Sequence, residues 1–234
     1  MKTSLYNIYR SACYNTKIVF ANKFVYFLIS ALGSFIAAVL IVIFSDFEIT
    51  EATAYNLLLL PSVLMAFYPS CFGIQNDSEA KILELIFGLP DYRYKIWLSR
   101  IIMNLAICFG FVVILAGITA LLLVDFSVMA MTFHVTVVCL FTSSLCFMLS
   151  TYVKNGNGAA VIFIAIGLLV FILNPSFEAN KWNILFNPYD IPMNKRPDIF
   201  EKIMIQNRLI LIAASLVMLV TGINSARNRE KFLR

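Results

Sequence analysis

Residues 76–100 read NDSEAKILELIFGLPDYRYKIWLSR, and they carry eight of the 31 charged side chains in this 234-residue chain. Two long apolar segments without a charged residue lie on either side of them. One charged side chain near the centre of a bilayer costs about 2.5–3.5 kcal/mol on insertion scales. Four acidic and four basic residues therefore cannot lie in hydrocarbon, and the stretch predicts a water-facing loop between two membrane spans.

This loop has the pattern of a short amphipathic helix at residues 77–87. Asn76 is placed to cap it, and Glu79 at its third position suits the positive end of the helix dipole. Apolar residues follow the i, i+3, i+4, i+7 rule, at Ile82, Leu85, Ile86 and Leu89. Gly88 and Pro90 then stop the helix. Such a helix is either a docking element or a simple interfacial connection between two spans.

The composition is that of an integral membrane protein. The chain is 61% hydrophobic, its mean hydropathy is +0.85, and 13% of its residues are charged. Soluble domains have about 25% charged residues, so this chain has too little polar surface for water. We expect one all-α membrane domain, and the net charge of +5 follows membrane orientation rather than a nucleic-acid partner.

The apolar pattern predicts six spans, at residues 24–44, 54–75, 101–124, 128–153, 159–173 and 209–226. Residues 1–23 have a helical apolar face and four basic residues, which predicts a helix lying in the membrane interface. The first span is too long for a signal peptide and is expected to stay as an anchor. Pro61 and Pro69 predict a kinked or broken second span.

Residues 174–208 hold four of the seven prolines and several aromatic residues. They are too apolar for a solvated linker and too interrupted to span, so we expect a packed, partly re-entrant outer loop. Asp198 and Glu201 resemble a capping pair that starts a helix running into the last span.

The basic residues predict the orientation. With both termini in the cytoplasm, 13 of the 18 Lys and Arg residues lie on the inner side and five on the outer side. This asymmetry agrees with the positive-inside rule. All five outer basic residues lie within residues 174–208, which fits a re-entrant segment there.

No reaction chemistry can be drawn from the motifs. The chain has no GxxxxGK[ST] phosphate loop, no HExxH zinc helix and no GxSxG or SxxK nucleophile. Its five cysteines lack CxxC spacing, so we expect packing residues rather than disulfides or a metal site. The single histidine, His134, lies in the fourth span, where we expect a helix–helix hydrogen bond. The sequence therefore predicts no catalytic, cofactor-binding or metal-binding residue.

Residues 79–93, EAKILELIFGLPDYR, resemble the loop after span two in type-2 ABC exporter permeases. The pattern of that family is E-x-G-T-L-E, an apolar run, a proline, a basic residue and the next span. Lys81 and Ile82 depart from it where the family often has Gly-Thr, and Arg100 stands for the usual lysine. The layout of six spans, an N-terminal amphipathic helix and an outer loop between spans five and six is also similar.

The resemblance implies a permease subunit of an ATP-driven exporter, in a bacterial inner membrane. Residues 76–100 would be the cytoplasmic coupling loop, whose helix docks on a separate ABC ATPase subunit. Glu79, Glu84 and Arg93 would be its polar contacts, and Pro90 would fix its end. A second permease copy or a paralogue would complete the dimer. ATP would bind the partner ATPase, and this chain would bind no cofactor. Residues 5–15 would form the flanking elbow helix.

Two other hypotheses remain open from the residues themselves. A membrane scaffold could recruit a soluble partner through the same helix without transport. An intramembrane lipid-modifying enzyme could use His134 with a carboxylate such as Asp190 from the outer loop. No residue in the sequence selects a transported substrate.

Overall fold

The computed structural model describes residues 23–44, 48–79, 92–173, 180–192 and 196–226. These residues form six helices and no strand. The helices are α2 (Phe24–Phe44), α3 (Glu51–Glu79), α5 (Tyr92–Leu122), α6 (Val128–Val153), α7 (Gly156–Leu173) and α8 (Pro197–Ala226). Each is long and apolar enough to cross a membrane, so the prediction of six membrane-spanning helices is confirmed.

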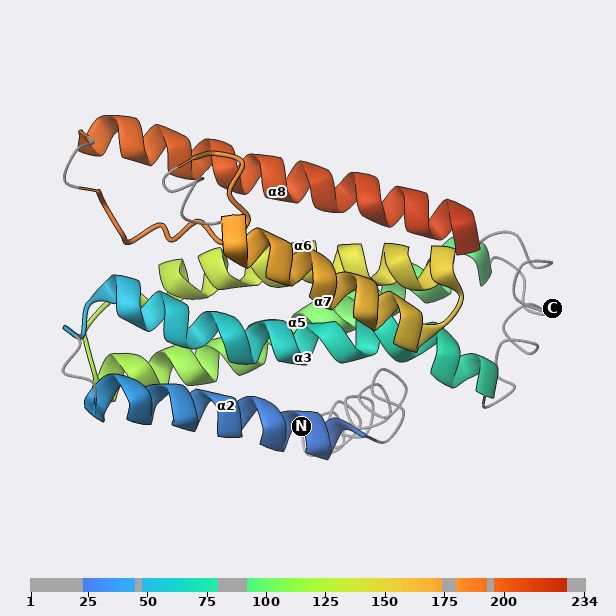
Figure 1. The fold of residues 1–234 in the computed structure, drawn as a ribbon, viewed down its shortest axis with the longest axis horizontal. Helices are drawn as coiled ribbons and strands as arrows, with labels where there is room; N and C mark the ends of the chain where they lie inside the picture. The colour runs from blue at the N-terminus through green and yellow to red at the C-terminus, as the bar shows by residue number, and fades with distance from the viewer. Residues whose placement is uncertain (1–22, 45–47, 80–91, 174–179, 193–195, 227–234) are drawn as a thin grey trace, which may run out of the picture.

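The six helices run up and down along one long axis (Figure 1). We call one end the loop end, made of residues 180–192 with the starts of α3, α6 and α8. We call the opposite end the Asp77 end, made of the end of α3 and the starts of α5 and α7. Short connections between antiparallel neighbours produce this arrangement.

Helices α3 and α6 form the centre of the bundle. Helix α6 packs against α3, α5, α7 and α8, and α3 packs against α2, α5, α6 and α7. Side chains from three helices fill the core between them, including Tyr55, Met65, Val112 and Val135. Helices α2 and α7 lie outside and expose most of their apolar side chains. The four described cysteines are buried thiols within the bundle.

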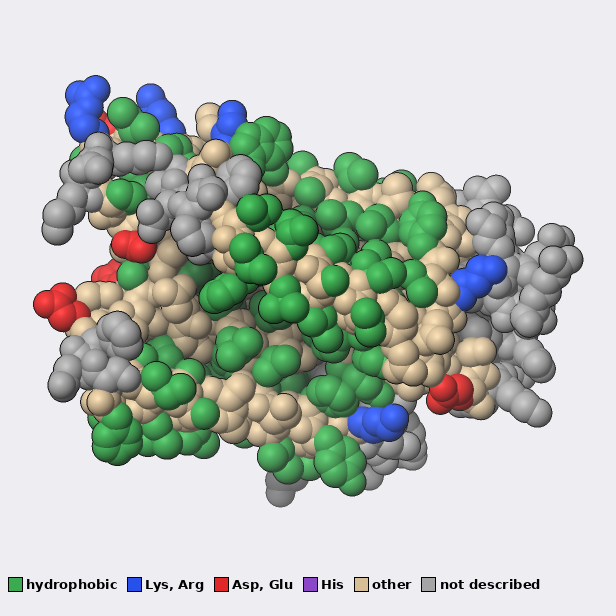
Figure 2. Space-filling model, in the orientation of Figure 1, with side chains coloured by type: hydrophobic (Ala, Val, Ile, Leu, Met, Phe, Trp, Pro, Cys, Tyr) green, Lys and Arg blue, Asp and Glu red, His purple; other side chains and the backbone are tan. Residues whose placement is uncertain are grey.

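The surface divides into an apolar belt and two charged ends. Hydrophobic side chains cover the middle of the face in Figure 2, and the Lys, Arg, Asp and Glu side chains gather at the two ends of the long axis. Water-soluble proteins do not expose an apolar area this extensive. The belt is the surface that a multi-pass membrane protein presents to lipid.

The helices extend beyond the predicted apolar segments. Helix α3 runs to Glu79, so Asn76 lies inside it and does not cap a new helix at Asp77. Helix α8 starts at Pro197 and runs into the sixth span, with Asp198 in its first turn instead of at the N-cap. The backbone hydrogen bonds of a helix do not depend on apolar side chains, so a helix can continue into water. A hydropathy pattern detects only the part of the helix that lies in hydrocarbon.

Pro61 and Pro69 lie inside α3, which is continuous across both. Of the kinked or broken span that the sequence predicts, the break is therefore absent. Packing on four sides holds this segment helical although each proline removes a backbone donor.

Candidate functional site

An ion pair joins α3 to α5, the two helices on either side of residues 80–91. Arg100 Nη1 donates to Asp77 Oδ2, joining the last turns of α3 to the third turn of α5. Both side chains are mostly buried, so water screens the pair less than a surface pair. The pair therefore fixes the two helices that flank residues 80–91 to each other, although its two residues are 23 positions apart in sequence.

The end of α3 is also fixed to α7. The Gln75 side chain accepts a 2.7 Å hydrogen bond from the backbone N–H of Gly156 and donates one of 2.7 Å to Glu79. Asn76 donates to the Tyr68 hydroxyl, about two turns deeper in α3, at 3.1 Å. The Asp77 end thus joins three helices through side chains of one helical turn.

A small cavity lies directly inside this end, with about 30 Å³ of space for a water-sized sphere. Its walls come from α3, α5 and α6, at Pro69, Ser70, Gly73, Ile74, Trp97, Arg100, Ile101, Asn104 and Phe147. Trp97 is buried, and its indole N–H has no hydrogen-bond partner among the described residues. The cavity is about large enough for one water molecule.

Asn104 links three helices at the inner wall of the cavity. Its amide donates to Ser70 Oγ of α3 at 3.1 Å and Ser143 Oγ of α6 at 3.2 Å. It also reaches the Ala66 carbonyl at 3.4 Å. Asn104 is 2% exposed, so these bonds replace water that is absent at this depth.

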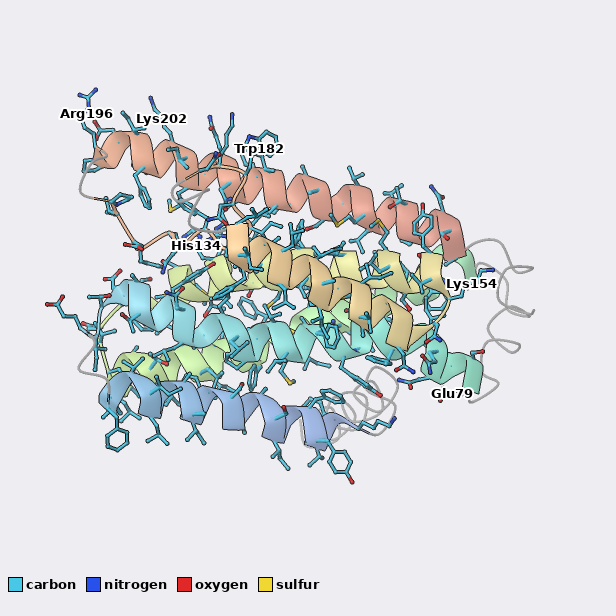
Figure 3. The ribbon with its side chains drawn as sticks, viewed as in Figure 1. Glu79, His134, Lys154, Trp182, Arg196 and Lys202 are labelled. Atoms are coloured by element: carbon cyan, nitrogen blue, oxygen red, sulfur yellow. The ribbon has the colours of Figure 1, made fainter. Side chains whose placement is uncertain are left out.

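The predicted coupling residues fall around this end. Glu79 is the last residue of α3 and is exposed, and Figure 3 shows it at the end opposite His134. Arg93 is the second residue of α5. Glu84 and Pro90 lie outside the described residues, as does most of the predicted coupling helix. The predicted elbow helix at residues 5–15 lies outside them too.

The loop end contains a second polar cluster, centred on Arg208 of α8. Its Nε donates to His134 Nδ1 of α6 at 3.2 Å, which confirms the predicted helix–helix hydrogen bond of that histidine. Its Nη2 donates to the Tyr55 hydroxyl of α3 and to the Phe186 carbonyl, both at 3.1 Å. Arg208 is 4% exposed. One guanidinium therefore joins α3, α6, α8 and the 180–192 segment.

Asparagines hold the 180–192 segment in place. Asn180, Asn183 and Asn187 each accept the backbone N–H two residues later, which fixes three tight turns. Asn187 also donates to the Ala52 carbonyl at 2.9 Å, and Asn207 donates to the carbonyls of Lys181 and Asn183. The described part of residues 174–208 before α8 is thus packed onto α3 and α8.

Tyr189 covers the Arg208 cluster from this segment. Its ring lies 5.9 Å from the His134 ring and 6.2 Å from the Tyr55 ring. Burial raises the pKa of the Tyr189 phenol to about 12, and the nearby Glu51 carboxylate adds to the rise. The phenol therefore stays neutral at physiological pH.

Helix α3 connects the two ends in one piece. Tyr55 in its first turns contacts Arg208, and Asp77 in its last turns contacts Arg100. A helix of 29 residues is about 44 Å long, which spans the whole hydrocarbon layer. One continuous helix therefore contacts both polar clusters.

Sequence reasoning missed Arg208 and the Asp77–Arg100 pair. Arg208 was counted with the outer loop because the apolar run begins one residue later. The capping pair at Asp198 already predicted a helix through this position, and a charged residue inside a span is a functional signal. The pairing of Asp77 had no sequence signal, because it depends on the register of α3 against α5.

No family model, curated protein or solved structure matches this chain.

Proposed function

We propose that this protein is the membrane-spanning permease subunit of an ATP-driven exporter, with the ATPase on a separate subunit. The observation that carries the proposal is the Asp77–Arg100 pair. It joins the two helices on either side of residues 80–91, α3 and α5, to each other. One of these, α3, continues to the loop end. A partner that pushes on residues 80–91 would therefore move the bundle instead of bending a loose connection.

The proposed mechanism is a shift between two arrangements of the bundle. An ATPase docked on the proposed coupling helix at residues 77–87 would favour one arrangement when it binds ATP and the other after hydrolysis. Glu79, Glu84 and Arg93 are its proposed polar contacts. Motion would pass through α3 to the Arg208 cluster and the 180–192 segment, which would open or close the outer side.

The proposed assembly is a pair of permeases, identical or paralogous, on two ATPase subunits. The exposed apolar faces of α2 and α7 leave room for lipid and for a second copy. The proposed location is the inner membrane of a bacterium, as the resemblance of residues 79–93 implies. Both termini are proposed to be cytoplasmic, because 13 of the 18 Lys and Arg residues then lie on the inner side.

The test is capture of the tagged protein from its native membranes in mild detergent, followed by an ATPase assay. We expect a stoichiometric partner with a GxxxxGK[ST] loop. The double variant Glu79→Lys, Glu84→Lys should lose at least 90% of the captured ATPase activity, because it reverses two charges at the docking segment. The single variant Glu84→Lys should retain the pair of permeases but uncouple ATP turnover from transport.

Glu201→Lys is the matched control. Glu201 is also an exposed helical glutamate, but it lies in α8 at the loop end, and its reversal should leave ATPase capture unchanged. Capture of a stoichiometric partner without ATPase activity would favour the scaffold hypothesis instead. Activity of the purified protein alone on a lipid, lost in His134→Ala, would favour the enzyme hypothesis.

A further inference from the structure

The guanidinium of Arg208 is a buried positive charge without a described counter-ion. Within the described ranges, the ion pair below 4 Å joins Asp77 to Arg100 at the opposite end, and no carboxylate lies that close to Arg208. An arginine does not give up its proton in a protein. Burial of an ionised group without a partner of opposite charge is costly, so an unpaired guanidinium at this depth needs a reason.

The hydrogen bonds of Arg208 leave part of its fork unused. A guanidinium has five N–H donors. Nε uses one for His134, and Nη2 uses two for the Tyr55 hydroxyl and the Phe186 carbonyl. Nη1 has no hydrogen-bond partner although it is buried. Two donors on one side of the fork are therefore unoccupied.

The groups around the fork are all neutral. His134 accepts at Nδ1, which requires that this nitrogen is unprotonated. Tyr189 stays protonated because its pKa is raised to about 12. The Tyr55 ring lies 5.8 Å from the guanidinium carbon, so aromatic faces line the cluster. The Glu51 carboxylate lies near Tyr189, but among the described residues no carboxylate forms an ion pair with the guanidinium.

We propose that Arg208 is the centre of an occluded binding site for an anionic group, a carboxylate or a phosphate. Nη1 and Nη2 form the planar fork that binds two oxygens of such a group. The Phe186 carbonyl holds one Nη2 donor in the closed state, and this carbonyl belongs to the 180–192 segment. An anion would take its place and also satisfy Nη1.

The same contacts identify residues 180–192 as the segment that covers the site. Asn187 of this segment donates to the backbone of α3, and Asn207 of α8 donates to the backbone of the segment. These are hydrogen bonds to side-chain amides, which can break without unfolding a helix. Displacement of this segment opens the fork. The proposal concerns binding by the isolated protein and does not rest on the exporter function.

The test uses the purified full-length protein in an uncharged detergent. The thermal unfolding midpoint is followed by tryptophan fluorescence while sodium phosphate, sodium acetate or phosphatidylglycerol is added. Sodium chloride at equal ionic strength is the reference. We expect a saturable rise of the midpoint, because a ligand that binds only the folded state stabilises it. Saturation with the lipid alone would identify a headgroup, and saturation with phosphate or acetate a soluble anion.

Arg208→Gln should weaken the apparent affinity for the anion at least tenfold, because it removes the positive charge and the planar fork. Glutamine is chosen because its amide keeps the position polar. Lys202→Gln is the matched control, because Lys202 is an exposed cation on the same helix and its loss should leave the affinity unchanged. Figure 3 places Lys202 at the loop end, so a general attraction of anions to that surface would be lost in this variant as well. An equal loss in both variants would overturn the proposal.

Tyr55→Phe tests the site even if Arg208→Gln does not fold. It removes one neutral acceptor and frees one of the two Nη2 donors while the charge remains. The protein without anion should unfold at a lower temperature, and its affinity for the anion should be retained or increased severalfold. A midpoint that no anion raises, in the wild type and in Tyr55→Phe, would assign Arg208 a structural role only.

Discussion

The Gln75 side chain of α3 accepts a hydrogen bond from the backbone N–H of Gly156, at 2.7 Å and across 81 residues of sequence. Gly156 is the first residue of α7 and is buried against α3. The backbone of α7 therefore begins in direct contact with α3, at a position where no side chain fits.

Gly156→Ala should destabilise the protein by about 1–3 kcal/mol, as overpacking does in other well-packed cores. The added Cβ would lie 2.7 Å from both Gln75 Oε1 and Phe72 Cδ1, and 3.3 Å from the Cys71 carbonyl. Thermal unfolding in detergent measures the effect. Gly167→Ala is the control within the same helix, because its Cβ meets nothing within 4 Å, and it should be neutral. Equal midpoints for the two variants would contradict the close contact.

Breaking the Asp77–Arg100 pair should loosen the Asp77 end. Asp77→Asn leaves the Arg100 charge largely buried and without its partner, and a loss of about 3 kcal/mol or more is typical of such a change. The charge-exchanged double variant Asp77→Arg, Arg100→Asp should recover part of this loss. Unfolding midpoints of the two single variants and the double variant form the test. If the double variant lost as much stability as the two single variants lose together, the two side chains would not form a direct pair.

Asn104→Ala should weaken the contact of α5 with α3 and α6. The change removes hydrogen bonds to Ser70 and Ser143. Interhelical hydrogen bonds in membrane proteins average about 0.6 kcal/mol each, so we expect a total loss of about 1–2 kcal/mol. Denaturant unfolding measures it. Asn157→Ala, an exposed asparagine at the start of α7, should change stability by less than about 0.5 kcal/mol.

Asn187→Ala should release residues 180–192 from α3 without unfolding the bundle. The variant loses the bonds to the Ala52 carbonyl and to Asn56. Hydrogen exchange of this segment should become about tenfold faster, while the core of α6 keeps its protection. Asn180→Ala is the control, because its described side-chain bond is confined to its own turn. Its effect should be limited to the residues next to it.

The membrane-spanning pattern could be predicted from the sequence because lipid imposes it on every residue of a span. Helices α2 and α6 have the bounds of their apolar segments. The polar ends could not be predicted as well, since a helix continues into water where hydropathy gives no signal. Asn76 therefore has the pattern of a cap, although α3 continues past it to Glu79.

The buried charges were the hardest part to predict. His134 could be assigned to a helix–helix hydrogen bond because a lone histidine in a span needs a partner. Its partner, Arg208, lies 74 residues away, and their contact depends on how α6 packs against α8. A single sequence contains no direct information on such a register.

The fastening of residues 180–192 has a consequence for synthesis of the protein. The described hydrogen bonds that tie this segment to α8 use Asn207 and Arg208, and Phe186 packs against Phe200 of the same helix. These α8 residues all leave the ribosome after the segment. Its contacts with α3 can form earlier, but its contacts with α8 form only after α8 has been synthesised. The loop end is therefore complete only when α8 packs onto it, so that α8 closes this end of the bundle during biogenesis.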